Sequence, residues 1–335
     1  MISMRQARRG INLGGWLLVE RWIPGVFDGV QGPAEIDIVK ELGYEAAKSR
    51  LTAHRETFIT EKDLIWIKKQ GFDFVRLPVG YWLFKKTDDF IDGEVYIRRA
   101  FRWADKHGLG VILDFHGLQG SQNGKDHSGQ VGKVQLYVGN NQSHALETLA
   151  YMARTYGSEK ALLGIEVINE PHVKYCTRKL LRYYDRAYEA IQPHLSPDTK
   201  IIVSDAFLPL RLARALSKRS YASRLVLDVH LYQVFSARDQ RMSFEEHVKK
   251  ADQDWWDLLD AIQHYLPVLI GEWSAALPAT AYANGVSNEA ERVNEYYTAQ
   301  KQTFDDAAWA HAYWTYKAPY CGVWSWCESR DILQP

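Results

Sequence analysis

The segment Leu162-Leu163-Gly164-Ile165-Glu166-Val167-Ile168-Asn169-Glu170 is a short, mainly apolar run that ends in a carboxylate. Such a run is typical of a buried strand whose tip carries a functional group. A second run of this kind, Leu266-Pro267-Val268-Leu269-Ile270-Gly271-Glu272, lies further along the chain. Two such tips can bring Glu170 and Glu272 together across one pocket, and a pair of carboxylates is what cleavage of a glycosidic bond requires.

Outward from these two runs, strand-like runs alternate with segments of helical period, which is the pattern of a parallel sheet wrapped by helices. The residues predict eight strands, at 10–16, 72–77, 110–115, 164–169, 201–204, 225–230, 268–272 and 312–315. Helices are expected between them, for example at 61–70 and at 95–107. Eight strands with intervening helices predict an α/β fold, a single (β/α)8 TIM barrel.

The chain shows no sign of a division into domains. It has no proline-rich or glycine/serine-rich linker and no short-period repeat, so residues 1–335 are expected to form one catalytic barrel domain. The segment 117–141, which follows the third predicted strand, is long, polar and glycine-rich. Because long ordered loops tend to be functional, and loops after barrel strands lie at the catalytic face, we expect this loop to border the site.

The charge of the chain limits its partners. Its 41 lysines and arginines balance 41 aspartates and glutamates. A chain without net charge has no field that favours nucleic acid or an acidic membrane surface, so neither is expected as a partner. The 12 tryptophans and 19 tyrosines are many, and although most are expected in the core, aromatic faces suit the apolar faces of sugar rings.

The cysteines and the N-terminus bear on the location of the protein. Cys176, Cys321 and Cys327 form no C-x-x-C pair and are odd in number, which favours a reducing compartment. No signal peptide is evident, and no stretch reaches the roughly 18 apolar residues of a membrane span. We therefore expect a cytoplasmic protein, while a processed form of a secreted protein stays the alternative.

Several polar or aromatic residues share one position, the carboxyl end of a predicted strand. They are Arg76, His116, Asn169, Glu170, His230, Tyr232, Glu272 and Trp314. Taken alone, each has a structural explanation as a cap, an ion pair or a core residue. Because all of them fall at the same end of their strands, they predict one site at the mouth of the barrel.

The separation of the two glutamates determines the stereochemical outcome. A distance of about 5–5.5 Å gives retention through a covalent intermediate, and roughly 6.5–9.5 Å gives inversion. Arg76 is suited to keep Glu272 ionised, and Tyr232 is suited to donate to the same carboxylate. The carboxyl that acts as the acid is expected to have a raised pKa because of its apolar setting and its carboxylate neighbour. Asn169 is suited to bond a sugar hydroxyl beside the reacting carbon.

A set of motifs in chain order supports a resemblance to a known family. They are Arg9-Gly10-Ile11-Asn12-Leu13-Gly14-Gly15-Trp16, Val75-Arg76-Leu77-Pro78-Val79-Gly80-Tyr81-Trp82, Leu113-Asp114-Phe115-His116-Gly117, Gly120-Ser121-Gln122-Asn123-Gly124, Gly164-Ile165-Glu166-Val167-Ile168-Asn169-Glu170-Pro171, Val203-Ser204-Asp205-Ala206-Phe207, His230-Leu231-Tyr232-Gln233-Val234-Phe235-Ser236, Ile270-Gly271-Glu272-Trp273 and Tyr313-Trp314-Thr315. With them the chain resembles glycoside hydrolase family 5 of the retaining clan A barrels, and most closely its exo-β-1,3-glucanase branch.

The resemblance implies a role for each site residue. Glu170 would be the general acid/base and Glu272 the nucleophile. The subsite for the non-reducing glucose would be lined by Arg76, His116, Asn169, His230, Tyr232 and Trp314. Glu20, with Trp22 beside it, would bind the distal hydroxyls of that glucose and so restrict action to chain ends. Phe235 would form part of an aromatic wall for the leaving sugar, unless it is a core residue.

The implied activity is that of a retaining exo-β-1,3-glucanase or β-glucosidase that releases glucose from a β-glucan oligosaccharide or a small β-glucoside. No cofactor is needed for this chemistry. None of the 11 histidines forms an H-E-x-x-H spacing, so no metal is expected, and the chain lacks a G-x-S-x-G elbow or a G-x-x-x-x-G-K loop.

The chain departs from the branch at two places that bear on the leaving group. Where the branch usually carries an aromatic residue and an asparagine before a glycine, this chain has Leu136-Tyr137-Val138-Gly139. After Trp314 the branch continues with a second tryptophan and an acidic stretch, whereas here Tyr316-Lys317-Ala318-Pro319-Tyr320 leads to Trp324-Ser325-Trp326. Three alternatives therefore stay open: a β-glucosidase or endoglucanase-like enzyme for other β-glucosides or β-1,4-glucan, a transglycosylase, and a carbohydrate-binding barrel without catalysis.

Overall fold

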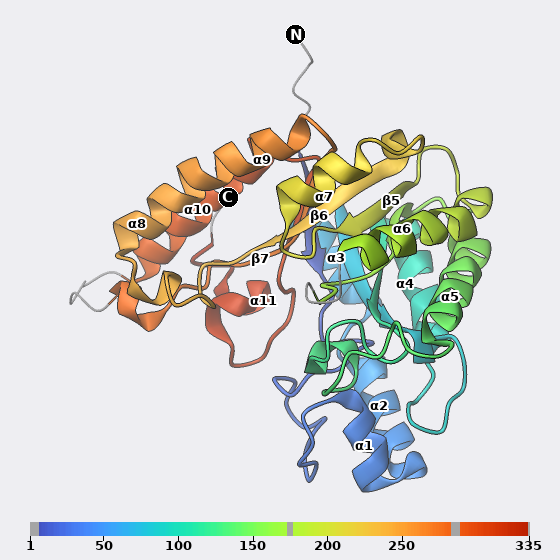
Figure 1. The fold of residues 1–335 in the computed structure, drawn as a ribbon. Coiled ribbons are helices and arrows are strands. Elements are labelled where there is room, and N and C mark those ends of the chain that lie inside the picture. Colours follow the sequence, from blue (N-terminus) through green and yellow to red (C-terminus); the bar gives the residue numbers. More distant parts are fainter. Residues whose placement is uncertain (1–6, 173–176, 283–288, 334–335) are drawn as a thin grey trace.

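The structure, a computed structural model, describes residues 7–172, 177–282 and 289–333. Its strands pair in chain order, all in parallel, and close into a barrel with helices around it (Figure 1). The predicted TIM barrel is confirmed. The strands are β1 Arg8–Asn12, β2 Phe74–Gly80, β3 Gly110–Gly117, β4 Leu162–Glu166, β5 Lys200–Ser204, β6 Leu225–Leu231, β7 Val268–Trp273 and β8 Ala310–Tyr313.

The helices follow the strands around the barrel. They are α1 Glu35–Leu42, α2 Tyr44–Thr57, α3 Glu61–Lys69, α4 Glu94–His107, α5 Asn141–Tyr156, α6 Thr177–Ile191, α7 Pro209–Leu216, α8 Phe244–Lys249, α9 Trp255–Gln263, α10 Glu289–Ala307 and α11 Trp326–Ser329. Local signals set some of their ends: α4 stops at Gly108, which is left-handed with φ 66°. Among the described residues, no helix combines the length and apolar character needed to cross a bilayer.

Two strands end before the predicted functional residues. β4 stops at Glu166 instead of 169, because the segment that follows leaves the regular ladder. Val167 N still donates to Ile202 O at 3.0 Å and Asn169 N to Phe115 O at 3.2 Å, so the segment stays between β3 and β5. β1 likewise stops at Asn12 instead of 16. Asn169 and Glu170 therefore lie just beyond β4, at the carboxyl mouth of the barrel, whereas Glu272 lies within β7.

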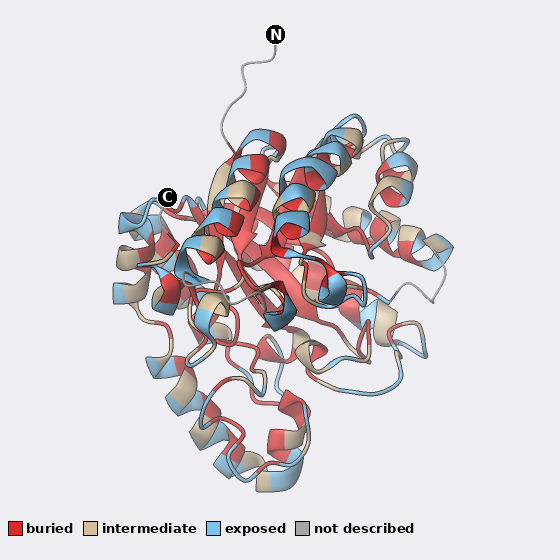
Figure 2. Ribbon diagram, turned by 90° about the vertical axis from the view of Figure 1, so that its left-hand side faces the viewer, coloured by how far each residue is buried: buried red, intermediate tan, exposed pale blue. Residues whose placement is uncertain are grey.

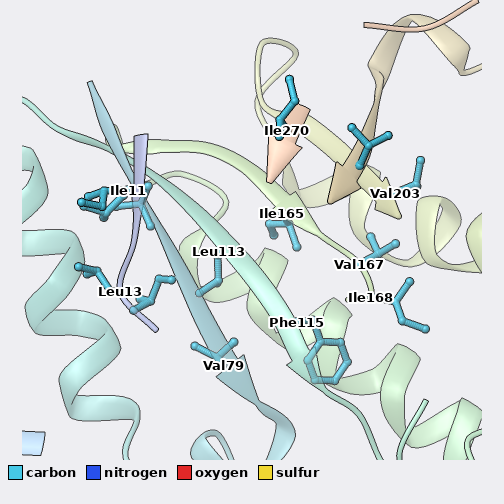
Figure 3. Close-up of a cluster of buried hydrophobic side chains, with 14 of the residues drawn as sticks. Ile11, Leu13, Val79, Leu113, Phe115, Ile165, Val167, Ile168, Val203 and Ile270 are labelled. Atoms are coloured by element: carbon cyan, nitrogen blue, oxygen red, sulfur yellow. The ribbon is translucent and has the colours of Figure 1, made fainter. Parts of the chain in front are cut away.

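Apolar side chains fill both sides of the barrel wall. On its outer side, residues such as Leu113, Phe115 and Ile165 form part of a large core (Figure 3). Figure 2 shows the central strands almost entirely buried and the helices buried only along their inner faces. A separate cluster, which includes Phe74 and Ile112, is contributed by several strands. Gly10 allows Phe74 to fit there, since a Cβ at this position would lie 2.2 Å from the Phe74 ring.

The connection between β1 and α3 forms a projection at the mouth of the barrel. Its helices α1 and α2 lie below the barrel in Figure 1, over a separate small core that includes Val19, Ile23 and Leu51. An ion pair between Glu35 Oε1 and Arg55 Nη2, 3.0 Å long and buried on both sides, ties the two helices together. Glu35 also accepts the backbone N–H of Val19, so the pair fixes the loop that carries Glu20.

Candidate active site

The floor of the site is a layer of polar residues inside the barrel, centred on Arg76. The guanidinium is fully buried on β2 and donates to Glu166 Oε2 at 2.8 Å, to Glu272 Oε1 at 3.0 Å and to Asn169 Oδ1 at 2.9 Å. It also pairs with Asp114 Oδ2 at 3.1 Å. Although burial lowers the pKa of Arg76, these carboxylates raise it well above the usual value, so the group stays charged.

Glu166 differs from the other carboxyl groups around Arg76. Burial raises its pKa well above the usual range, and Asp114 and Asp228 add to this against the lowering by Arg76. The pKa of Asp228 is instead lowered, since the charges of His230 and Arg76 and a hydrogen bond from Glu166 outweigh its burial. Burial thus favours the protonated form of Glu166, which relieves the repulsion among the carboxylates.

Both carboxylate oxygens of Glu272 accept hydrogen bonds from neighbouring side chains. It pairs across β6 and β7 with His230, and Tyr232 donates to its Oε2 at 3.0 Å while Arg76 donates to Oε1. The pKa of Tyr232 is far above its usual value because of burial and the nearby charges of Glu272 and Glu170, so its hydroxyl keeps its proton. The expected contacts of Glu272 with Arg76 and Tyr232 are present.

His230 lies between the two glutamates. Its Nδ1 is 2.8 Å from Glu170 Oε1 and 3.5 Å from Glu272 Oε2, and its Nε2 is 3.1 Å from Asp228 Oδ2. Burial lowers the pKa of His230, but Glu272, Asp228 and the hydrogen bonds raise it well above its usual value. One ligating oxygen of Glu170 lies within 4.8 Å of one of Glu272, which is the close spacing of a retaining pair.

Glu170 departs from the expectation for an acid. It has φ 41°, in the left-handed region, which stores strain at the tip of the segment after β4. Burial raises the pKa of Glu170, as expected. The hydrogen bond and charge of His230, followed by the charges of His127 and Lys125, lower this pKa by more than burial raises it, so the net shift is downward. The prediction of a raised pKa, if Glu170 is the acid, is therefore wrong, because it left out the cations.

A cation is disfavoured between these carboxylates. Glu170, His230 and Glu272 have ligating atoms close enough to hold an ion, as do Glu166, Asp228 and His230. In both groups His230 already bonds to carboxylates through its two nitrogens, and the charge of Arg76 lies beside them. The positive charges of Arg76 and His230 neutralise the carboxylates, as a metal ion in this position would do.

A pocket of about 460 Å³ opens above the two glutamates, a size typical of small-molecule sites. Its walls come from the loops after β1, β3, β4, β5, β6 and β8 and from the strands β3 and β7. The lining residues are Glu20, His116, Lys125, Asp126, His127, Glu170, Phe207, Tyr232, Phe235, Glu272, Trp314 and Trp324. Most of the residues expected at the site from the sequence thus border one cavity.

Four residues expected at the site do not line this pocket. Arg76 and Asn169 are fully buried beneath it and bond to each other and to protein groups, so their place in the glucose subsite stays a prediction. His230 lies between the glutamates, with 5% of its side chain exposed. Trp22 bonds to the Glu20 carboxylate and packs over Gly15, where a Cβ would lie 2.7 Å from its ring.

Glu20 and Trp314 mark one end of the pocket. Burial raises the pKa of Glu20 to about 7, with contributions from Asp126 and Glu272, against lowering by His116 and Trp22. The Trp314 ring lies 6.1 Å from His116 in a stacked arrangement. A titratable carboxyl beside a flat aromatic face suits a sugar ring, which offers hydroxyls at its rim and C–H groups on its face.

Phe235 is a rim residue and not a core residue. It is 75% exposed, and its ring lies 5.4 Å from Tyr232 and 6.1 Å from Trp324. Phe207, 51% exposed, also lines the pocket. The pocket thus has exposed aromatic rings at its rim, available to contact a ligand.

The loop at 117–141 borders the site as expected, but through other residues than the sequence suggested. Lys125, Asp126 and His127 line the pocket, whereas Leu136 is fully buried in the core and Val138 is absent from the lining. The departure at 136–139 therefore does not form the pocket wall. The polar run at 125–127 is the sequence feature that could have identified the lining residues of this loop, since charged residues inside a long loop after a barrel strand often reach the site.

Comparisons with known proteins agree with this geometry. The family model "Cellulase (glycosyl hydrolase family 5)" matches residues 39–319. Over 309 residues the chain is 35% identical to the probable glucan 1,3-beta-glucosidase A of Aspergillus niger, covering 88% of this chain and 72% of that protein. The glucan 1,3-beta-glucosidase of Schwanniomyces occidentalis is 35% identical over 298 residues, covering 84% and 69%.

Solved structures share the fold. The rutinosidase from Aspergillus niger superposes with a TM-score of 0.78 at 19% identity, over 95% of this chain and 92% of that one. Thermotoga maritima Cel5A, solved with cellobiose, gives a TM-score of 0.60 at 14% identity, over 99% and 98%. A closed barrel with two close glutamates above one pocket defines a retaining glycoside hydrolase. With the family match, the chain belongs to glycoside hydrolase family 5.

Proposed function

We propose that the protein is an exo-acting β-1,3-glucanase or β-glucosidase that releases glucose from non-reducing ends. The observation that carries this proposal is that Glu20 and the Glu170–Glu272 pair border the same pocket of about 460 Å³. A glucose held by Glu20 at its distal hydroxyls then presents its anomeric carbon to the pair. The names of the relatives from Aspergillus niger and Schwanniomyces occidentalis support β-1,3-glucan as the substrate.

The mechanism is a double displacement in which both glutamates act in each half. Glu272, oriented by Arg76 and Tyr232, attacks the anomeric carbon, while Glu170 gives a proton to the leaving oxygen. A covalent glucosyl-enzyme results. In the second half, Glu170 takes a proton from water, the hydroxide attacks the anomeric carbon, and Glu272 leaves as a carboxylate. The β-configuration is thereby retained.

The product profile tests exo action. Incubation with a laminarin-type glucan should yield glucose as the first product, and NMR should show the β-anomer before mutarotation. Early release of mixed oligosaccharides would exclude action from chain ends. An α-anomer as the first product would exclude the retaining assignment of Glu170 and Glu272.

The leaving-group side of the pocket leaves room for other β-glucosides. Phe207 and Phe235 offer apolar faces, and the exposed ammonium of Lys125 acts on Glu170. This surface suits an aromatic aglycone as well as a sugar. Rates on β-1,3-oligosaccharides, cello-oligosaccharides and aryl β-glucosides should separate these substrates, and longer products at high substrate concentration would reveal a transglycosylase.

The expected cytoplasmic location stays a prediction. Cys321 and Cys327 are free thiols, and Cys176 lies outside the described residues. Free thiols are common in reducing compartments. Fractionation of the source cells, followed by an activity assay in each fraction, tests this location.

A further inference from the structure

A chain of four side chains leads from the barrel interior to Glu170. His116 Nδ1 lies 2.7 Å from Asp114 Oδ2, His127 Nδ1 lies 3.3 Å from His116 Nε2, and His127 Nε2 lies 3.4 Å from Glu170 Oε2. All four are largely buried, with 15% of the His127 side chain and 15% of the Glu170 side chain exposed. The activity described so far assigns no role to His127.

The hydrogen bonds around His116 determine which proton each nitrogen carries. Asn169 Oδ1 accepts from Arg76 at 2.9 Å, so its Nδ2 is the atom that lies 3.2 Å from His116 Nε2. Asp114 raises the pKa of His116 against its burial, but the amide N–H of Asn169 points at Nε2, so Nε2 accepts and the ring proton of His116 lies on Nδ1 toward Asp114. His116 Nε2 then also accepts from His127 Nδ1.

This tautomer has a consequence at the other side of the His127 ring. In a neutral His127 the single ring proton lies on Nδ1, which donates to His116. Its Nε2 then carries no proton, and the lone pair of Nε2 faces Glu170 Oε2. Asn123 Nδ2 also lies 3.4 Å from this nitrogen, but a lone pair and a carboxylate repel each other, so a proton shared between Nε2 and Oε2 stabilises their contact. This proton is carried either by Glu170, which donates to Nε2, or by His127, which donates to Oε2.

We propose that His127 is a positioning residue that shares one proton with Glu170 and so keeps the acid supplied for the first half of the reaction. This proposal rests on the assignment of Glu170 as the acid/base. The proton passes from His127 Nε2 to Glu170 Oε2, and from Glu170 to the leaving oxygen as Glu272 bonds to the anomeric carbon. In the second half the proton that Glu170 takes from water returns to His127 Nε2.

Other charges act on this pair and define its pH dependence. Burial, followed by His116, lowers the pKa of His127, while Glu170, Glu272 and Asp126 raise it, and the lowering prevails. On the Glu170 side, His230 bonds to Oε1, and Lys125 and Asp205 act through their charges. His230, Lys125 and a charged His127 favour an ionised Glu170, whereas a neutral His127, whose Nε2 accepts, favours a protonated Glu170.

The variant His127→Asn tests the sharing of the proton. Asparagine can donate to Glu170 but cannot hold the proton, so the ionised form of Glu170 gains stability. For an alkyl β-glucoside we expect kcat/KM at neutral pH to fall about 10–100-fold, which is a part of the roughly 10²–10⁴-fold that general acid catalysis supplies. The alkaline limb of the pH profile should move to lower pH. With 2,4-dinitrophenyl β-glucoside, whose leaving group needs no proton, the rate should stay within about twofold.

Two controls keep the outcome clear. His144→Asn replaces an exposed histidine on α5 and should leave both profiles unchanged. In protein with 15N-labelled histidine, the Nε2 resonance of His127 should titrate with the alkaline limb, and in Glu170→Gln this titration should move to lower pH. An unchanged profile in His127→Asn, or an unchanged titration in Glu170→Gln, would overturn the shared proton. If Glu170→Gln cleaved an alkyl glucoside like the parent, the acid/base assignment itself would fail.

Discussion

Nη1 of Arg76 lies 3.0 Å from Oε1 of Glu272, so the carboxylate proposed as the nucleophile is oriented from inside the barrel. The same guanidinium bonds to Glu166 and to Asn169, which precedes Glu170. The guanidinium of Arg76 thus fixes both sides of the site, Glu272 directly and Glu170 through Asn169. A planar guanidinium makes these bonds at fixed angles, whereas an ammonium is a single point of charge.

The variant Arg76→Lys should therefore keep the charge and lose the geometry. We expect the free energy of unfolding to fall by about 2–4 kcal/mol, since hydrogen bonds to charged groups are worth about 1.5–3 kcal/mol each. The kcat/KM for an aryl glucoside should fall about 10²-fold or more because Glu272 loses its orientation. Arg99→Lys, in a partly exposed pair with Glu56, is the control and should change stability by less than about 1 kcal/mol. Equal losses in both variants would contradict the orienting role.

Glu166 gives a sharper test of the polar layer. Burial favours the protonated form of Glu166, and for this form Glu166→Gln replaces one neutral donor and acceptor by another of the same shape. We expect thermal unfolding and kcat/KM to stay close to those of the parent. Asp114→Asn, which removes an acceptor of both Arg76 and His116, should be clearly more damaging. If Glu166→Gln proved as damaging as Asp114→Asn, Glu166 would be ionised.

Glu20 should make stability depend on pH. The native state holds a proton on Glu20 up to a pKa of about 7, against the ordinary value of 4.5, so between these values it binds more protons than the unfolded state. The contribution of this group to stability is therefore lost as pH rises from about 4.5 to about 7. Relative to the parent, Glu20→Gln should gain about 1–3 kcal/mol on going from pH 4 to pH 8. Urea unfolding of both proteins at pH 4 and pH 8 measures this gain. If the difference in the free energy of unfolding between variant and parent were the same at both pH values, the raised pKa of Glu20 would be contradicted.

The same variant should damage substrate binding. Above pH 7, where Glu20 is ionised, loss of this charged acceptor for sugar hydroxyls should lower kcat/KM on a β-1,3-oligosaccharide about 10–100-fold, as expected for hydrogen bonds to a charged group. Gain in stability at pH 8 together with loss of activity is the expected combination. A variant with unchanged kcat/KM would place the end of the substrate elsewhere.

The barrel could be predicted from the sequence because its strands are nearly continuous apolar runs, and these runs also located Glu170 and Glu272. The polar layer that forms the floor of the site could not be predicted from the sequence. That Arg76 and Asn169 lie beneath the pocket follows from bonds between β2 and the segment after β4, which no local pattern records. The raised pKa of Glu166 likewise depends on neighbours distant in the chain.

The sequence predicted that the loop after β3 borders the site, but not which of its residues line the pocket. The path of this loop depends on internal bonds, such as the one between the Ser121 and Ser128 hydroxyls at 2.6 Å, and on Gln122, which donates to His116 O at 2.6 Å and to Asn169 O at 2.9 Å. These bonds turn His127 toward the pocket and leave Leu136 in the core. Composition alone does not distinguish the two outcomes.

The ion pair of Glu35 and Arg55 should control the position of Glu20. Glu35→Gln leaves the buried Arg55 without a countercharge, and breaking such a pair costs about 3–5 kcal/mol. Because Glu35 also bonds to Val19, beside Glu20, we expect KM for a β-1,3-oligosaccharide to rise as well. Urea unfolding and steady-state kinetics measure the two effects. Glu56→Gln, in a partly exposed pair, is the control, and similar losses in both variants would show that burial is unimportant.

Lys125 should tune the choice of leaving group. Its exposed ammonium acts on Glu170 and, with Phe207, lines the pocket, so it can attract a negative charge on an aromatic aglycone. For Lys125→Gln we expect the ratio of kcat/KM for a carboxyphenyl β-glucoside to that for the phenyl glucoside to fall about 2–5-fold, the effect of an exposed ion pair.

Taking the ratio removes the influence of Lys125 on the pKa of Glu170, because both substrates need the same acid. Salt provides a second measurement: at about 1 M ionic strength the Debye length is about 3 Å, so the parent should approach the ratio of the variant. Lys133→Gln, a change elsewhere in the same loop at a residue absent from the pocket lining, should leave the ratio unchanged. A ratio in Lys125→Gln equal to that of the parent at low salt would show that the ammonium does not reach the aglycone.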